Sequence, residues 1–445
     1  MGSGGLDVIN LEAMETSIKK EVLFIAARFL EKMLNDDSSD YRGATVPCLL
    51  CGQGARYVSR HAKTFTTVLG DMTLRRAYYY CPSCGEGFCP RDYEQGFGDS
   101  SLSPGINRMI SLVASAESFL AGEKLLSELA SVHLSGKCVE RTAKKIGAAI
   151  AADEVSYVEE APNPRDTMYV GVDGTGIPMR PNELLGRVGK QPNGTAKTRE
   201  VKECVVWTAD SRDSKGNPVR DKGSVTYSAS IESCAWRNTG SEEDIPAFAR
   251  RVERELTRTG FFLARQQVFL GDGAPWIWNL ADMMAPLAIQ IVDLYHAKEH
   301  LSKLANDIFG PSTDLATKWA GDRHKELEVG NLDAVLSALN GQTSQLGDRG
   351  EKAAREFEYF SNNRHRMRYD YFRSLGLCVG SGVVEAGCKV VVAQRLKRSG
   401  MFWSVQGANA ILALRCSLLS NRFDKFWARF RAHQKPPTGS TKANC

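Results

Sequence analysis

Hydrophobic residues recur every three to four positions along residues 11–34, with lysines and glutamates between them. This spacing predicts one amphipathic helix, which we interpret as a packing or dimerisation element. The same rhythm returns between residues 103 and 150. It predicts one helix from Ser103-Pro104 to about Ser115, a second over 118–132 and a third over 138–151, after a turn that contains Gly136. The last two form a predicted helix-turn-helix, for which an ordinary helical hairpin is an equal alternative.

The periodicity changes after residue 166. Residues 168–179 predict a strand, a glycine turn and a second extended piece. Further elements are predicted in the order strand 198–209, strand 224–231, helix 241–260, strand 266–272, helix 276–285, strand 288–296 and helix 297–307. Three strands followed by alternating helices and strands is the order of an RNase H-like domain, with a mixed sheet whose first three strands are antiparallel.

The predicted fold class is therefore multidomain α/β, with an RNase H-like catalytic domain that carries a helical insertion. A zinc-ribbon-like unit and a helix-turn-helix-like domain precede it. The expected boundaries are 1–45 for the N-terminal helix, 46–100 for the zinc-ribbon-like unit, 101–157 for the helical DNA-binding domain, 158–166 for a linker, 167–300 for the first part of the catalytic domain, 301–373 for the insertion, 374–432 for the last part with a long basic helix, and 433–445 for a disordered tail.

Composition narrows the class of protein. The 445 residues are 42% hydrophobic and 24% charged, which excludes collagen-like, coiled-coil and wholly disordered chains. No apolar run reaches the roughly 18–20 residues of a membrane span, and no secretory signal opens the chain. We therefore expect a cytoplasmic protein without a membrane partner. The net charge of +5 is mild and only hints at a polyanionic partner.

Five of the twelve cysteines lie between residues 48 and 89. Cys48-x-x-Cys51 and Cys81-x-x-Cys84 flank a stretch with the alternation of a hairpin, which turns at Gly70-Asp71. Two such pairs supply four thiolates for a structural zinc ion. Disulfides are disfavoured by a reducing compartment, and a redox motif is disfavoured because the pair occurs twice. Cys89 and His61 are alternatives for one of the four ligands.

Three acidic residues occupy positions where chemistry is expected. Asp173 lies in the first strand and Asp272 ends the fourth, each followed directly by glycine, and Glu385 lies in the first turn of a helix. A single Asp after a strand is more often a cap or turn residue. Carboxylates on neighbouring strands, with a third from a helix, would instead hold two Mg²⁺ or Mn²⁺ ions for phosphodiester chemistry. Asp293 and His296, which end the predicted fifth strand, could contact the phosphate or orient a carboxylate, although a single histidine is most often structural.

Basic residues follow these positions. Most runs of basic residues are simply helix faces exposed to solvent. A basic surface next to an acidic site, however, is what binding of the DNA phosphate backbone requires, so we predict contact with double-stranded DNA. The predicted DNA-binding residues are Arg141, Lys144 and Lys145 on the third helix of 103–150, Arg364, Arg366 and Arg368 in the insertion, and Lys389, Arg395, Lys397, Arg398 and Trp403 on or after the basic helix.

Together these segments resemble the DDE-type transposases of bacterial insertion sequences, specifically the Kra-four group. The resemblance runs from about residue 45 to residue 427. It is carried by VGVDGTGIPM, REVK, LGDGAPWIWNLA, IQIVDLYHAKEHL and GSGVVEAGCKVVVAQRLKRSGMFWSVQGANAILALRC, and in the first half by YYCPSCG and SFLAGEKLLSEL. Cys378 and Phe402 depart from the family pattern, where proline and a basic residue are expected.

The resemblance implies a catalytic triad of Asp173, Asp272 and Glu385, with Asp293 and His296 as an accompanying Asp-x-x-His signature. It also implies metal-dependent cleavage at terminal inverted repeats, attack of the freed 3′-hydroxyl on target DNA, and a homodimer or larger synaptic assembly. Two alternatives remain, a non-catalytic domesticated DNA-binding regulator and a structure-specific nuclease on the same fold.

Overall fold

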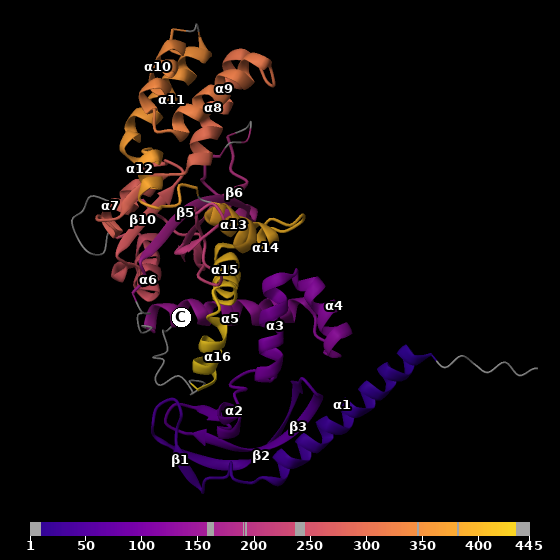
Figure 1. Ribbon diagram of the computed structural model, residues 1–445. Coiled ribbons are helices and arrows are strands. Elements are labelled where there is room, and N and C mark those ends of the chain that lie inside the picture. The colour runs from indigo at the N-terminus through magenta and orange to yellow at the C-terminus, as the bar shows by residue number, and fades with distance from the viewer. Residues whose placement is uncertain are drawn as a thin grey trace, which may run out of the picture. The chain divides into compact units, whose positions relative to one another are not determined.

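The chain divides into two structural units, each built around its own sheet (Figure 1). The computed structural model describes residues 10–157, 164–189, 191, 194–235, 245–344, 347–380 and 382–432. The first unit comprises Met1–Ile146 with Arg422–Cys445, and the second comprises Gly147–Asn421. The predicted tail 433–445 and most of the predicted linker 158–166 lie outside the described residues.

A four-stranded antiparallel sheet forms the base of the first unit, in the order β1-β2-β3-β4. The strands are β1 (Thr45–Pro47), β2 (Gly54–Thr67), β3 (Gly70–Cys81) and β4 (Glu86–Phe88). The predicted hairpin is therefore present as β2 and β3. Its tight turn uses Gly70, whose φ of 122° is a conformation that favours glycine.

Helix α1 (Leu11–Asp36) packs on this sheet through its second half only. Ala27 is buried, and Leu30 and Leu34 contact a core cluster that contains Phe65 and Leu74. Asn10 caps the first turn by accepting a hydrogen bond from the Ala13 amide, at 3.2 Å. The helix predicted over 11–34 is thus confirmed.

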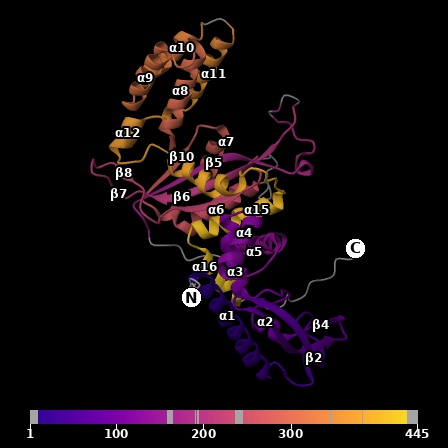
Figure 2. The same cartoon turned by 90° about the vertical axis from the view of Figure 1, so that its right-hand side faces the viewer.

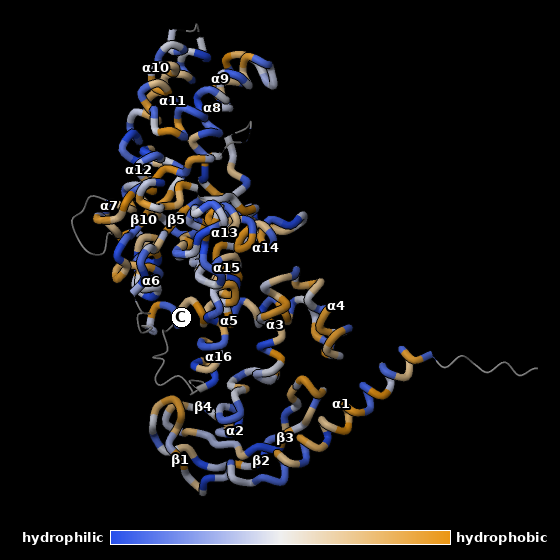
Figure 3. Tube along the Cα trace, viewed as in Figure 1, coloured by the Kyte–Doolittle hydropathy of each residue, from blue (hydrophilic) through white to orange (hydrophobic). Residues whose placement is uncertain are grey.

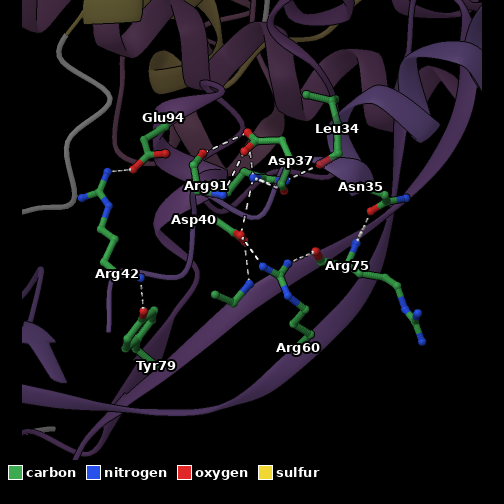
Figure 4. Close-up of polar contacts among 12 residues, drawn as sticks. Leu34, Asn35, Asp37, Asp40, Arg42, Arg60, Arg75, Tyr79, Arg91 and Glu94 are labelled. Carbon is green, nitrogen blue, oxygen red and sulfur yellow. Dashed lines mark hydrogen bonds and ion pairs between the residues drawn. The ribbon is translucent and has the colours of Figure 1, made fainter. Parts of the chain in front are cut away.

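A buried ion network ties the end of α1 to the sheet (Figure 4). Arg91, 2% exposed, donates to the Asp37 carbonyl at 2.7 Å and lies 3.4 Å from the Asp40 carboxylate. Arg60 donates to the same carboxylate at 2.8 Å, and its other oxygen accepts the Ala77 amide of β3 at 2.7 Å. Because Asp40 is only 1% exposed, its charge depends on these partners.

Helices make up the rest of the first unit. They are α2 (Pro90–Glu94), α3 (Pro104–Ala116), α4 (Phe119–Ala130), the larger part of α5 (Gly136–Ser156) and α16 (Phe423–Ala432). Ser103 and Ser118 cap α3 and α4, which confirms the predicted helix start at Ser103-Pro104. The three helices predicted between 103 and 150 are present. Their helix-turn-helix role stays a prediction.

The second unit is built on a five-stranded sheet in the order β11-β10-β5-β6-β9. The strands are β5 (Thr167–Pro178), β6 (Thr198–Thr208), β9 (Thr226–Ser230), β10 (Gln266–Gly271) and β11 (Ile289–Val292). β6 pairs antiparallel with β5 and β9, whereas β10 pairs parallel with β5 and β11. The prediction of a mixed sheet whose first three strands are antiparallel is confirmed.

The glycine turn predicted inside 168–179 is wrong. β5 runs without a break, because its pairing with β6 continues through Gly174 and Gly176. The two glycines leave room for neighbouring side chains instead: a Cβ on Gly174 would lie 2.5 Å from the Glu200 carboxylate. A small β7–β8 hairpin (Ser211–Arg212 and Pro218–Val219) lies between β6 and β9 in the chain.

Helices cover the sheet and supply the third acidic residue. They are α6 (Ala247–Thr259), α7 (Pro275–Met284), α13 (Gly382–Gly387), α14 (Gln394–Leu396) and α15 (Val405–Leu419), with 3-10 turns at Pro181–Leu184 and Phe261–Leu263. Between α13 and α14 the chain forms a π-helix over Cys388–Ala393, a feature that often accompanies functional sites. α13 approaches β5 so closely that a Cβ on Gly171 would lie 2.2 Å from the Val384 side chain.

The described residues of the predicted insertion form helices joined by short loops and contain no strand. It contains α8 (Leu294–Phe309), α9 (Asp314–Glu328), α10 (Leu332–Gln342), α11 (Asp348–Asn362), a 3-10 turn at Arg364–Arg366 and α12 (Tyr369–Ser374). Figure 2 shows α8 to α11 side by side beyond one edge of the sheet. The block therefore starts directly after β11 and returns to the sheet before α13.

Candidate functional site

Asp173 and Asp272 lie next to each other on neighbouring parallel strands, Asp173 within β5 and Asp272 directly after the last residue of β10. β10 pairs parallel with β5, with Leu270 opposite Gly171, so two residues further along each strand come Asp272 and Asp173. The Asp272 side chain accepts a hydrogen bond from the Ala274 amide at 2.8 Å. The two carboxylates are close enough that the negative charge of Asp272 contributes to a raised pKa of Asp173.

Both carboxylates line a pocket of about 280 Å³ together with three further predicted residues. These are Asp293, His296 and Glu385. Glu385 lies in the first turn of α13, as predicted, but its side chain is 70% exposed and forms an ion pair of 2.9 Å with Lys389. The structure therefore brings the triad to one pocket without gathering its oxygens into a tight cluster.

Asp293 and His296 are joined by a helix cap. Asp293 is the N-cap of α8, and its Oδ1 accepts the His296 amide at 2.7 Å. The carboxylate is buried, 3% exposed, whereas the His296 side chain is 39% exposed and lines the pocket. Asp293 thus fixes the start of α8, and His296 is the member of the pair that can reach a bound molecule.

Asp173 is held by two donors. The Gly174 amide donates to Oδ1 at 2.6 Å, and the thiol of Cys388 donates to Oδ2 at 3.3 Å. Burial is the largest influence on this carboxyl group and raises its pKa, with Asp272 adding to the effect and the two hydrogen bonds opposing it. A cation bound at the pocket would offset both the cost of burying the Asp173 charge and its repulsion from Asp272. A pair of carboxylates in this situation therefore suits a hard metal ion.

Glu203 is a fourth carboxyl group at this place, and the sequence analysis missed it. It lies opposite Asp173 on β6 and is completely buried. Neither of its oxygens has a well-formed hydrogen bond among the described residues, although Cys388 lies beside it. Burial raises the pKa of Glu203 to about 8, so it is mostly protonated at neutral pH. A glutamate at an inward position between Val201 and Val205 is the signal that could have revealed it.

Tyr359 connects the helical insertion to the site. Its hydroxyl donates to the carbonyl of Asp272 at 2.8 Å, and its ring stacks on His300 with centroids 4.2 Å apart. The ring passes so close to the chain that a Cβ on Gly273, whose φ is 96°, would lie 2.5 Å from it. A residue of α11 therefore helps to fix the backbone of Asp272.

The two hydrogen bonds to Asp173 give a first prediction. Cys388→Ala is expected to weaken Mn²⁺ binding at the pocket by about 10–100-fold, because groups that orient metal ligands typically contribute this much. Cys388→Ser keeps a donor and is expected to bind more tightly than the alanine variant. Electron paramagnetic resonance of free and bound Mn²⁺ measures both. Cys378→Ala is the control, since the Cys378 thiol donates to the Pro218 carbonyl instead. Equal affinity in all variants would contradict a positioning role for Cys388.

Two of the predicted DNA-binding residues are buried, and these assignments have to be corrected. Arg395 has no exposed surface: its guanidinium lies 5.2 Å from the Trp403 ring centre and contacts the Met401 sulfur. Trp403 is 5% exposed and donates through its ring nitrogen to the Leu396 carbonyl at 3.0 Å. Both side chains hold the end of α14 against the following chain, so neither faces solvent where DNA would bind.

The other predicted DNA-binding residues of the second unit differ in how far their side chains are exposed and in whether they are already paired. Lys397 is exposed and donates to the Thr175 hydroxyl, two residues beyond Asp173, while Arg398 donates to the Gln394 carbonyl at 2.7 Å. In the insertion, Arg368 is exposed over the Tyr371 ring and Arg364 pairs with Asp333 at 2.6 Å. Arg366 is half-buried between Gln290 and the Trp278 ring.

In the first unit, α5 presents a basic face. Arg141 and Lys145 are exposed, and Lys137, which the sequence analysis did not select, is exposed one turn earlier. The spacing of four residues places these three cations on one side of the helix. Lys144 pairs with Glu140, which offsets its charge.

The four cysteines of the first unit form a metal-binding group. Cys48, Cys51, Cys81 and Cys84 place their sulfurs within 4.8 Å of one another, and among the described residues no other His, Cys, Asp and Glu side chains form such a group. Two of the sulfur pairs are 3.6 and 3.7 Å apart. A Zn–S distance of about 2.3 Å in tetrahedral geometry requires about 3.8 Å between sulfurs. The four thiols can therefore hold a zinc ion.

The alternatives for a zinc ligand lie elsewhere. Cys89 is buried outside the group, where burial raises the pKa of its thiol to about 11. The His61 ring stacks on Tyr78 with centroids 4.1 Å apart. Within the group, burial acts to raise the pKa of Cys81, but hydrogen bonds from the backbone amides of Cys84 and Ser83 and from the thiols of Cys51 and Cys84 together lower it to about 6, which favours the thiolate that zinc requires.

Comparisons with known proteins add little to this geometry. No protein-family model matches the chain, and no curated protein matches its sequence. Among solved structures, the chain is similar to a Drosophila P element transposase strand transfer complex, at 9% identity and a TM-score of 0.26, over 77% of this chain and 84% of that chain. A TM-score this low does not establish a shared fold. Within the described residues, no helix is both long and apolar enough to span a membrane.

Proposed function

We propose that the second unit is an RNase H-like catalytic domain and that the chain is a DNA transposase. It would bind the terminal inverted repeats of an insertion sequence and cleave a DNA strand with the help of metal ions. The freed 3′-hydroxyl would then attack a phosphodiester of the target DNA, which joins the strand to the target and releases the target's own 3′-oxygen. The observation that carries the proposal is the pair Asp173 and Asp272 at neighbouring positions on adjacent parallel strands, in one pocket with His296 and Glu385. The strand order β9-β6-β5-β10-β11 supports it.

Asp173, Asp272 and Glu385 would hold two Mg²⁺ ions, or Mn²⁺. Ions bound there would activate a water molecule or a 3′-hydroxyl as the nucleophile and would stabilise the leaving oxygen of the phosphodiester. Neighbouring residues position these metal ligands. Gly174 and Cys388 orient the Asp173 carboxylate, and Tyr359 fixes the backbone of Asp272. Glu385 would bind an ion after its ion pair with Lys389 opens. His296 would contact or deliver a proton to a DNA oxygen.

DNA would be held by both units. In the second unit, exposed Lys397 beside Thr175 and Lys389 beside Glu385 provide cations next to the acidic pocket. In the first unit, the basic face of α5 with Arg141 and Lys145 would enter a groove as a recognition helix does, and the zinc unit would support repeat binding. Holding two ends at once requires at least a homodimer.

A non-catalytic DNA-binding regulator is the second candidate. The observation that favours it is the position of Glu385, which points to solvent and pairs with Lys389. In a regulator the three carboxylates would have no need to converge, and DNA binding would persist without cleavage.

The deciding experiment is a cleavage assay on a supercoiled plasmid that carries the flanking repeats. Wild type is expected to nick at the repeat ends in Mg²⁺ and not in EDTA, and Glu385→Gln is expected to lose this activity. Glu351→Gln, which removes an exposed carboxylate on α11, is the matched control and should cut normally. Specific binding without cutting by wild type would favour the regulator, and equal cutting of a plasmid without repeats would indicate a structure-specific nuclease.

A further inference from the structure

Helix α1 exposes an unusually large number of apolar side chains. Seven of them form a stripe along its length, each between 45% and 66% exposed: Leu11, Met14, Ile18, Val22, Ile25, Phe29 and Met33. Figure 3 shows these hydrophobic positions recurring along the helix. Monomeric proteins seldom leave a continuous apolar surface of this size in water.

The stripe lies away from the surface by which α1 packs on its own sheet. Ile18 and the buried Ala27 are nine residues apart, which at about 100° per residue places them on opposite sides of the helix. The intervals along the stripe are three, four and four residues, repeated from Leu11 to Val22 and from Val22 to Met33. This repeat of 11 residues is close to the natural turn of a helix, so the stripe runs almost straight.

The first half of α1 also lacks the packing that usually stabilises a helix. All residues from 11 to 20 are exposed, and the bond from the Lys19 ammonium to the Leu129 carbonyl, at 3.0 Å, is a surface contact. Helices in water depend mainly on burial of an apolar face. The exposed stripe is the face that a partner would bury.

The apolar area of the stripe is large enough to form part of a protein interface. Burial of one such side chain from full exposure corresponds to roughly 60–120 Å² of apolar surface, so seven that are 45–66% exposed supply roughly 250–500 Å². A standard stable interface buries about 800 Å² on each partner, so the stripe would supply the apolar centre of such an interface and the polar residues beside it the rim. A second copy of α1 would supply the same apolar stripe over the same length, so that apolar residues meet apolar residues.

The charges of α1 argue against a lipid surface. The helix carries five acidic residues and four basic ones, so its polar face lacks the basic excess that binds anionic membranes. We propose that the α1 stripes of two copies of this chain pack against each other, and that this contact makes the protein a dimer before any DNA is bound. This goes beyond the proposed function and does not depend on it.

Sedimentation velocity of the full chain without DNA tests the proposal. Wild type is expected to sediment as a dimer of the 48.9 kDa chain at micromolar concentration. Ile18→Glu with Ile25→Glu places two charges in the stripe and is expected to give a monomer. Thr16→Glu with Lys20→Glu places charges on the same helix, nine residues from Ile25 and Phe29 and therefore on its other side, and should leave the dimer intact.

A milder change guards against misfolding of the charged variant. Phe29→Ala is expected to weaken the dimer by about 10-fold or more, with the melting temperature of the monomer unchanged, since interface aromatics often contribute at this level. The proposal is overturned if wild type is monomeric at all concentrations, or if both stripe variants dimerise as wild type does. Either result leaves the cleavage assay unaffected, so the two hypotheses fail separately.

Discussion

Replacing Asp272 with asparagine is expected to abolish DNA cleavage while leaving binding to the repeat ends intact. Asp272 shares the pocket with Asp173 and points there from the end of β10. Asparagine keeps the shape and can still accept the hydrogen bond from the Ala274 amide, but it removes the negative charge that a divalent cation needs. Changes around a metal site already cost about 10–100-fold, so loss of a ligand should cost at least about 1,000-fold in cleavage rate.

The measurement is a time course of nicking together with a gel-shift titration of the repeat DNA. Asp282→Asn is the control, because Asp282 is an exposed carboxylate on α7 that bonds to Gln290 and lies outside the pocket. It should cut and bind as wild type does. Loss of repeat binding in Asp272→Asn would show that this carboxylate serves folding or DNA contact, and the assignment to chemistry would then be wrong.

Local patterns in the sequence predict the strands of the second unit well, because each strand carries its own alternation. β5, β6, β9, β10 and β11 appear in the predicted order along the chain, and the first three pair antiparallel as predicted. The glycine turn in β5 was wrong for a reason that lies in another strand. Gly174 is held extended by pairing with Lys202, and a single segment gives no sign of that partner.

The same limit explains the grouping of the chain ends. α16 follows α15 after only a short connection, so the sequence assigned both to one domain, yet Arg422–Cys445 groups with the first unit. Which core an amphipathic helix joins depends on contacts between distant segments. The pair Arg108 and Asp424, 2.8 Å apart, is one such contact and joins α3 to α16.

For the site, the sequence predicts carboxylates that follow strands but not those that support them. Asp173 and Asp272 are each marked by a following glycine, whereas Glu203 is hidden within a largely apolar strand and Cys388 is a single cysteine with no motif around it. For basic residues the sequence predicts too many site residues rather than too few. Arg395 belongs to a positively charged run, but its guanidinium is buried against Trp403, and charge alone cannot reveal which side of a helix faces solvent.

The second large effect is expected from Cys81→Ser in the first unit. Structural zinc sites contribute about 10–16 kcal/mol, so one of four thiolates carries on the order of a quarter of this free energy, roughly 100-fold or more in zinc affinity. Cys48 and Cys81 also belong to the core cluster with Val46, Tyr79 and Phe88. Loss of the ion would therefore loosen the small core itself.

Zinc content by atomic emission and thermal unfolding by circular dichroism measure the two consequences. Wild type is expected to carry one zinc ion per chain. Addition of a chelator should abolish the thermal unfolding transition of the first unit, and Cys81→Ser is expected to behave as the chelated protein does. Cys89→Ser removes a buried thiol outside the group and should keep its zinc. A Cys81→Ser variant that melts as wild type does without metal would exclude a zinc site. Because the cysteines and the acidic pocket lie in different units, Mn²⁺ binding at the pocket should survive the loss of zinc, which distinguishes the zinc ion expected at the cysteines from the divalent ions proposed for the pocket.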